Sequence, residues 1–319
     1  MNLVIEEEFS LAQLTPNANT IDLQPIESLD AFGVVTLVCL IQDRATTQQQ
    51  TILPGRADVQ QWLSKIGFFT EVTRRCQNQV IGIDETLPMP MAASGNDAFT
   101  SVRYSTPGDE RRVADDFRQS FGAFGYGEDL LNIGGCIIGE AGDNSRAHAH
   151  CSSHFMVNGT FAPRNLRIGI ADLGSGLLTA FRRNPNHSHL DDNRALLTSL
   201  LARHSGTQTP RRGNGLTELL KWTMTLKGTL RIDSGGRTLK IECGTEEVIA
   251  RVLDWLGWSR IGEIYKSHSK YHGLTPALQM PVCDGLRGTR IGVILEDRTA
   301  VDISRQTAND LVEQFLRKL

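Results

Sequence analysis

Strands gather late in this chain, after a long helical segment, and that order restricts the folds open to it. Leu130, Ile133, Ile137 and Ala141 recur at helical spacing and predict a long helix from residue 129. A glycine-rich loop at 213–215 is followed by a second apolar helix. Helices combined with clustered strands favour an α+β fold, with helices on one face of a mixed or antiparallel sheet. The predicted strands are residues 166–171, 229–232, 238–243 and 289–295.

The first 80 residues have the alternating pattern of a small α/β domain. Residues 32–41 form an apolar run suited to a helix that is buried against a sheet. Asp58 is a candidate N-cap of a later helix that Gly67 can end. The stretch that follows contains several Pro and Gly residues without a clear period, as expected of a connector. The predicted organisation is a regulatory or docking domain at 1–80, a connector at 81–114, and a larger domain at 115–319 with a C-terminal insertion and a terminal helix.

Composition excludes several classes of protein. The chain has 319 residues, 40% of them hydrophobic and 22% charged, which is typical of a globular protein. Its formal net charge is -3 and its basic residues are scattered, so we expect no nucleic-acid partner. No apolar run approaches the ~20 residues that span a bilayer, and Glu6 to Glu8 do not suit a signal peptide. With six singly placed cysteines, these features predict a cytoplasmic protein with reduced thiols and no membrane partner.

Three polar side chains share one side of the first long helix. Glu140, Asn144 and His148 are four residues apart, so all three side chains stay within about 80° of one another around the helix. This face departs from the apolar stripe and can line a site. The alternative is an ordinary solvated helix surface.

A turn with a carboxylate and two glycines follows the first late strand. Asp172 stands at the predicted strand end, and Gly174 and Gly176 follow it. A carboxylate in this place can accept a hydrogen bond from an exocyclic amine, and the glycines let a ligand approach the backbone. The alternative is a tight turn without a ligand.

The second glycine-rich segment, RRGNGL, precedes the second helix. Backbone N–H groups at a helix N-terminus bind phosphate oxygens, and glycines let the chain wrap around them. Arg212 is close enough in sequence to assist. An ordinary loop is the alternative. The chain contains neither GxxxxGK[ST] nor GxGxxG, so the common phosphate-loop and dinucleotide folds are not supported.

Together and in this order, the three segments resemble the N, G1 and G2 boxes of the Bergerat-fold ATP-binding superfamily, most closely its anti-sigma-factor kinases. GEAGDNSRAHA carries the E-x3-N-x3-H pattern, IADLGSGL the strand with DxGxG, and RRGNGL the GxGL. Gly288-Thr289 looks like the Gly-Thr entry to the last strand of that domain. The resemblance covers about residues 115–295. It implies a two-layer α/β sandwich that binds ATP and Mg²⁺.

The resemblance also implies roles for single residues. Asp172 would accept the adenine amine, with Thr289 supporting it through a water. Asn144 would be the Mg²⁺ ligand, and its amide oxygen is an adequate hard donor. Glu140 would be the general base for water or for an acceptor hydroxyl. The remaining residues of the nucleotide site would be His148, Gly174, Gly176, Arg212, Gly213, Gly215 and Leu216, with Gly213 and Gly215 around the phosphates.

The N-terminal domain resembles the STAS-like fold of anti-sigma-factor antagonists. IDLQPIESLDAFGVVTLVCLI looks like its strand, turn and helix, and DVQQWLSKIGFF like its later helix. Phosphorylatable members carry a serine before the helix glycine, whereas this chain has Phe32 before Gly33. Because Phe32 has no hydroxyl, we expect a docking or dimerisation surface rather than a kinase substrate.

Two histidine groups invite other interpretations. His148, His150, Cys151 and His154 suggest zinc, but no further ligand stands at a recognisable spacing. The group from His187 to Asp192 falls where the Bergerat fold has its mobile ATP lid, and a solvated loop explains it better than a metal. Residues 244–288, including a predicted helix at 246–256, are extra packing or a partner site.

The functional expectation is a Mg-ATP-binding protein of regulatory signalling that is either an ATPase or a serine/threonine protein kinase. The alternative is a non-catalytic switch in which ATP orders the lid around 178–212 and shifts a protein-binding equilibrium. We expect a protein partner or a homodimer. A gyrase-like enzyme is disfavoured because the chain has no room for a DNA-cleavage domain.

Overall fold

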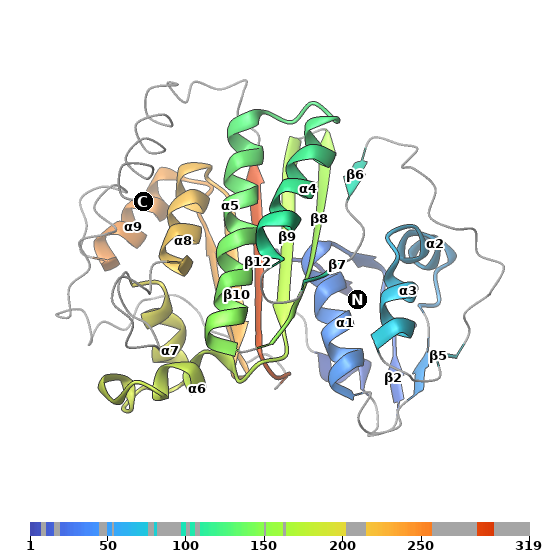
Figure 1. Cartoon of the computed structure of the whole chain (residues 1–319), viewed down its shortest axis with the longest axis horizontal. Helices are drawn as coiled ribbons and strands as arrows, with labels where there is room; N and C mark the ends of the chain where they lie inside the picture. The colour runs from blue at the N-terminus through green and yellow to red at the C-terminus, as the bar shows by residue number, and fades with distance from the viewer. Residues whose placement is uncertain are drawn as a thin grey trace.

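A computed structural model describes most of the chain. The described residues are 1–7, 11–15, 20–44, 50–52, 54–75, 80–81, 97–99, 103–105, 109–149, 151–161, 164–201, 215–256 and 286–296. The protein combines a large sheet with helices, which confirms a mixed helix and sheet fold (Figure 1).

The larger sheet has seven strands in the order β11-β10-β12-β9-β8-β6, and β7 also pairs with β8. Each of these pairings is antiparallel, as the late clustering of strands predicts. β9 and β12 lie in the middle of the sheet. The strands are β6 (Asp97–Phe99), β7 (Arg103–Ser105), β8 (Ser153–Phe161), β9 (Arg164–Asp172), β10 (Thr229–Ser234), β11 (Arg237–Glu242) and β12 (Thr289–Glu296).

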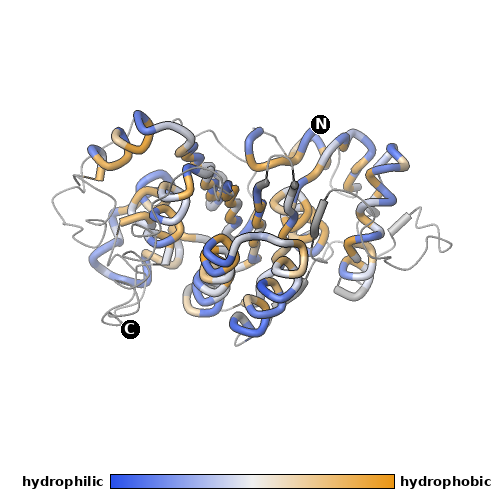
Figure 2. Tube along the Cα trace, turned by 90° about the horizontal axis from the view of Figure 1, so that it is seen from above, coloured by the Kyte–Doolittle hydropathy of each residue, from blue (hydrophilic) through white to orange (hydrophobic). Residues whose placement is uncertain are grey.

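Three helices cover one face of this sheet: α4 (Glu110–Gly122), α5 (Glu128–Asn144) and α8 (Gly215–Thr225). The apolar stripe of α5 packs in one core with the side chains of alternate β9 residues, among them Leu166, Ile168 and Ile170. Figure 2 shows hydrophobic and hydrophilic residues alternating along the helices, as expected of elements with one buried side. The predicted helix at 246–256 is confirmed as α9 (Glu246–Leu256).

The N-terminal elements form two small parallel sheets with three helices around them. β1 (Asn2–Leu3) pairs with β3 (Ser28–Leu29), and β2, β4 and β5 form the other sheet. The remaining bounds are η1 (Leu11–Leu14), β2 (Thr20–Asp22), α1 (Ala31–Arg44), β4 (Gln50–Ile52), α2 (Ala57–Lys65), α3 (Phe68–Arg75) and β5 (Val80–Ile81).

Helix α1 packs on the other face of the large sheet, against β8, β9 and β12. Gly169 of β9 and Gly292 of β12 are register partners and make room for its first turn. A Cβ at Gly169 would lie 2.3 Å from the carbonyl oxygen of Ala31, and one at Gly292 would lie 2.8 Å from the ring of Phe32. Residues 31–41 of α1 are all buried, which confirms the prediction of a helix buried against a sheet.

Several details differ from the sequence predictions. The predicted two-layer sandwich holds only for the C-terminal elements, because α1 packs on the other face of the large sheet and adds a third layer. The expected connector, 81–114, includes β6 and β7, which pair with β8, and the start of α4. Asp58 is not an N-cap, since α2 begins at Ala57 and the Asp58 carboxylate instead accepts from the Arg56 guanidinium, 3.0 Å from Nε.

Phe32 has no exposed surface and lies against Gly292, so this end of α1 docks within its own chain. None of the described helices combines the length and the apolar character needed to cross a bilayer. The described cysteines Cys39, Cys136, Cys151 and Cys243 are free thiols, in keeping with the prediction. The predicted terminal helix lies outside the described residues.

Candidate functional site

The predicted site residues meet where the C-terminal end of α5 reaches the end of β9 and the start of β12. Asp172, the last residue of β9, is 6% exposed. Its Oδ1 accepts from the backbone N–H of Gly174 at 2.9 Å and of Thr289 at 3.2 Å. Its Oδ2 accepts from the hydroxyl of Ser145 at 3.2 Å. One carboxylate therefore joins the turn after β9, the first residue of β12 and the end of α5.

Burial raises the pKa of Asp172 above its ordinary value, and the three hydrogen bonds oppose that rise. An ionised carboxyl group offers about four acceptor positions. The described residues fill three of them, which leaves one position on Oδ2 for a ligand N–H.

The other end of the site lies between α5 and the first residue of α8. A Cβ at Gly215 would lie 2.8 Å from Asn144 Nδ2 and 3.0 Å from Glu140 Oε2. Glycine is therefore needed there for both polar groups to reach the helix N-terminus. Asn144 Nδ2 is itself buried and has no hydrogen-bond partner in the described part of the chain. An uncompensated buried amide is costly and is expected where a ligand completes the hydrogen bonding.

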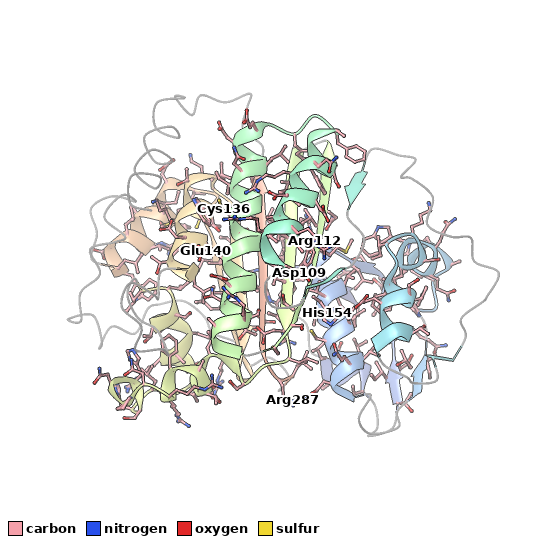
Figure 3. All side chains as sticks on the ribbon, in the orientation of Figure 1. Asp109, Arg112, Cys136, Glu140, His154 and Arg287 are labelled. Atoms are coloured by element: carbon pink, nitrogen blue, oxygen red, sulfur yellow. The ribbon has the colours of Figure 1, made fainter. Side chains whose placement is uncertain are left out.

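Glu140 lies one turn before Asn144 and is half-buried. Burial raises its pKa above the ordinary value, and the nearby charge of Asp143 adds to the rise. Figure 3 labels Glu140 and Cys136 one turn apart on the side of α5 toward α8. A carboxylate with a raised pKa is a stronger base than an ordinary one.

Ser145 connects the two ends of the site, and the sequence reasoning missed it. It follows Asn144 directly, and its Oγ lies 3.2 Å both from Ala141 O and from Asp172 Oδ2. It also opens a π-helical turn, Ser145–Ala149, a geometry frequent at functional sites. The available signal was a small hydroxyl residue next to the predicted metal ligand.

Two glycines with positive φ shape the strand ends around Asp172. Gly288 has φ +87°, and a Cβ there would lie 1.9 Å from the Asp172 carbonyl oxygen. Gly176 has φ +76° and opens α6 (Gly176–Arg182). Ser234 at the end of β10 ties these segments together: its Oγ accepts from Leu177 N–H and donates to the Gly288 carbonyl. The predicted Gly176 and Thr289 are thus adjacent to Asp172.

The remaining predicted residues have mixed outcomes. Leu216 is buried in the core that α8 forms with the sheet. The backbone of His148 lies in the π-helical turn, while its side chain lies outside the described atoms, as do Arg212 and Gly213.

The expectation of a solvated loop holds for His189 and Asp191, which are exposed, but not for His187. Within residues 176–199 lie α6, the 3-10 turn η4 (Pro185–His187) and α7 (Asp192–Ser199), joined by short turns. His187 is buried, with its ring edge-on to Phe181 at a centroid distance of 5.2 Å. Asp191 caps α7 by accepting from the N–H of Arg194.

The suggested zinc cluster can be placed only in part, because His150 and the side chain of His148 lie outside the described atoms. His154 lies in β8 and is 2% exposed; its Nε2 is 2.7 Å from Gln42 Oε1 of α1, and its Nδ1 is 3.8 Å from Glu71 Oε1 of α3. It joins β8 to the N-terminal helices. Over the described ranges, no group of three or more His, Cys, Asp and Glu side chains is arranged to hold a metal ion.

Comparison of the chain with protein-family models, with curated proteins and with solved structures gave no match. The functional argument therefore depends on the residues and on their geometry.

Proposed function

We propose that this protein binds Mg-ATP, with the base at Asp172 and the phosphates between Asn144 and the N-terminus of α8. One observation carries the proposal. The segments at 140–145, 172–176 and 215–216 are distant in sequence, yet they meet through the Ser145 to Asp172 hydrogen bond and the contact of Gly215 with Asn144. The same segments, in the same order, carry the resemblance to the Bergerat-fold superfamily.

The base end suits an adenine. The remaining acceptor position on Asp172 Oδ2 can receive an exocyclic N–H, and a buried hydrogen bond to an ionised carboxylate is stronger than one between neutral groups. Guanine presents a carbonyl oxygen where adenine has its amine, so it would set two acceptors against each other. Thr289 stays the proposed support for the base, because its N–H already fixes Asp172 Oδ1.

The phosphate end suits a polyphosphate with a divalent cation. α8 has 11 residues, so its first N–H groups and its dipole favour an anion at Gly215. The Asn144 amide lies against this helix start and offers a hard oxygen ligand. Bound Mg²⁺ would neutralise phosphate charge, and such ions keep several waters and need only one or two protein ligands. Arg212, Gly213 and His148 remain proposed members of this end.

Glu140 is the proposed general base. It lies on the Asn144 side of Gly215, and its raised pKa suits proton removal from a water or from a protein hydroxyl. The protein would then be an ATPase or a serine/threonine protein kinase acting in regulatory signalling in the cytoplasm, with a protein partner or a second copy of the chain.

A non-catalytic switch is the second candidate, and the position of α6 favours it. α6 starts four residues after Asp172, and its Leu177 N–H is fixed by Ser234, which also contacts Gly288. A nucleotide that moves the turn after Asp172 would shift α6 and α7 and so change a partner-binding surface.

Phosphate release by wild type and Glu140→Gln, with Mg-ATP affinity measured in both, separates these functions. For an enzyme, Glu140→Gln should lower release by about a hundredfold or more while affinity stays within about threefold. Glu128→Gln, an exposed change in the first turn of the same helix, is the matched control and should behave like wild type. Background release by a wild type that binds ATP would favour the switch, and a wild type that binds no ATP would refute the proposal.

A further inference from the structure

The N-terminal elements contact the proposed base end of the nucleotide site from behind the sheet. The residues on either side of Asp172 point away from α5: Ala171 is fully buried in the core formed mainly by α1, α2 and α3, and Leu173 packs against that core. Asp172 itself faces Ser145 of α5. The end of β9 is therefore held between the two halves of the chain.

The start of β12 is held in the same way. Leu286 is buried in the N-terminal core, and the Arg287 guanidinium donates from Nε to Oδ1 of Asp43, in the last turn of α1, at 2.6 Å. Gly288 and Thr289, the next two residues, contact Asp172 directly. Figure 3 labels Arg287 below the end of the sheet, at the C-terminal end of α1.

Electrostatics agrees with this proximity. Burial raises the pKa of Cys39, one turn before Asp43 on α1, and the charge of Asp172 adds to the rise. The last turns of α1 and the Asp172 carboxylate are thus close enough to interact across the sheet.

We propose that Asp43 is a positioning residue for the nucleotide site: through Arg287 it holds the Gly288-Thr289 backbone in the place where Thr289 fixes the base-binding carboxylate. The inference rests on the proposed nucleotide binding. Under this proposal, the packing of the N-terminal elements on the sheet raises the affinity for the nucleotide. Because such coupling is reciprocal, a bound nucleotide in turn stabilises that packing.

The same two halves also meet near the middle of β9, which supplies a control. Arg167 pairs with Glu6 at 2.6 Å and lies 3.6 Å from Asp30, five residues from Asp172 or about 17 Å along the strand. A change at Arg167 weakens the attachment of the N-terminal elements without touching the base end.

The experiment is a calorimetric titration of Mg-ATP into the full chain as wild type, Asp43→Asn, Arg287→Gln, the exchanged pair Asp43→Arg with Arg287→Asp, and Arg167→Gln. Because the Arg287 side chain is 62% exposed, the expected result is a loss of affinity of about three- to fivefold in each single variant at the Asp43 pair, and recovery to within about twofold of wild type in the exchanged pair. Arg167→Gln should lower the thermal midpoint and leave affinity within about twofold.

The inference would be overturned if Asp43→Asn and Arg287→Gln bound Mg-ATP as well as Arg167→Gln does, or if the exchanged pair bound it no better than these single variants. In either case, binding by wild type would still uphold the proposed nucleotide binding. No binding by wild type would overturn the proposed function and this inference together. A second readout on wild type is amide exchange: Mg-ATP should slow exchange in residues 36–44 of α1 relative to α2, and equal rates with and without bound nucleotide would count against the coupling.

Discussion

Two buried carboxyl groups lie on opposite faces of the sheet, Asp30 beside Arg167 near the middle of β9 and Asp172 at the end of this strand, and their hydrogen-bond donors differ. Asp30 is 2% exposed and caps α1: its Oδ1 accepts from the N–H of Gly33 and its Oδ2 from that of Ile5, both at 2.9 Å. The Arg167 guanidinium lies 3.6 Å away. Asp172 is almost as buried, but its three donors are two backbone N–H groups and a hydroxyl.

We interpret this difference as separating a structural acid, Asp30, from the proposed ligand-binding acid, Asp172. Asp30 has a cationic neighbour and helps to hold three chain segments together, which justifies the cost of burying it. Asp172 is stabilised in its ionised form by neutral donors alone among the described residues that shift its pKa. A buried carboxylate with a free acceptor position at a strand end is what a ligand site requires and what a core does not.

The pH dependence of stability tests the structural side of this comparison. Burial raises the pKa of Asp30 from 3.8 to about 6, so the native state binds the proton more tightly than the unfolded state does. Stability from this group is present below pH 3.8 and is lost as pH rises through about 6, a change of about 3 kcal/mol at ~1.36 kcal/mol per pH unit. Denaturant unfolding at several pH values measures it.

Asp30→Asn is neutral at every pH and keeps one acceptor for Gly33, so it should abolish this loss. Relative to wild type, the variant should gain about 3 kcal/mol between pH 4 and pH 7. An unchanged pH profile would contradict this prediction and would mean that the Arg167 guanidinium compensates the Asp30 charge fully.

The substitution Gly215→Ala tests the proposed phosphate end of the nucleotide site. Its Cβ would displace the ends of the Asn144 and Glu140 side chains rather than the backbone, so the fold should survive while the phosphate end is disturbed. We expect Mg-ATP affinity to fall about tenfold, or about 1.4 kcal/mol.

Gly139→Ala is the matched control, because a Cβ at Gly139 meets nothing within 4 Å. It should leave affinity unchanged and stabilise α5 by about 0.5–1 kcal/mol. Equal affinities for the two variants would mean that the Gly215 contact with Asn144 has no part in binding.

The sequence predicts a helix or a strand well where a single hydrophobic periodicity runs through the segment. The apolar spacing in α5 and α9 and the alternation in β9 predict those elements, because a helix or strand with one buried face must repeat at 3.6 or 2 residues. α1 was predicted as buried, but a helix that is apolar all round does not tell which sheet it meets. The register pair Gly169 and Gly292 carries that information, and it becomes visible only once β9 and β12 are aligned.

The candidate site also contains features that the sequence predicts and features that it does not. The sequence placed Asn144, Asp172, Gly215 and Thr289 in one site, and the structure brings these residues together through hydrogen bonds to Asp172 and the close approach of Gly215 to Asn144. The burial of His187 could not be predicted, because it is a polar residue that packs against an aromatic ring. The support from Asp43 was equally invisible, since it joins residues 244 positions apart.

The measurement that tests the central claim most directly is calorimetry of Mg-ATP and Mg-GTP with wild type and Asp172→Asn. Wild type should bind ATP in preference to GTP, and Asp172→Asn should weaken ATP binding at least about tenfold, because a hydrogen bond to a charged group contributes ~1.5–3 kcal/mol. Absence of binding heat with wild type, or equal ATP affinity in the two proteins, would contradict a base held by Asp172.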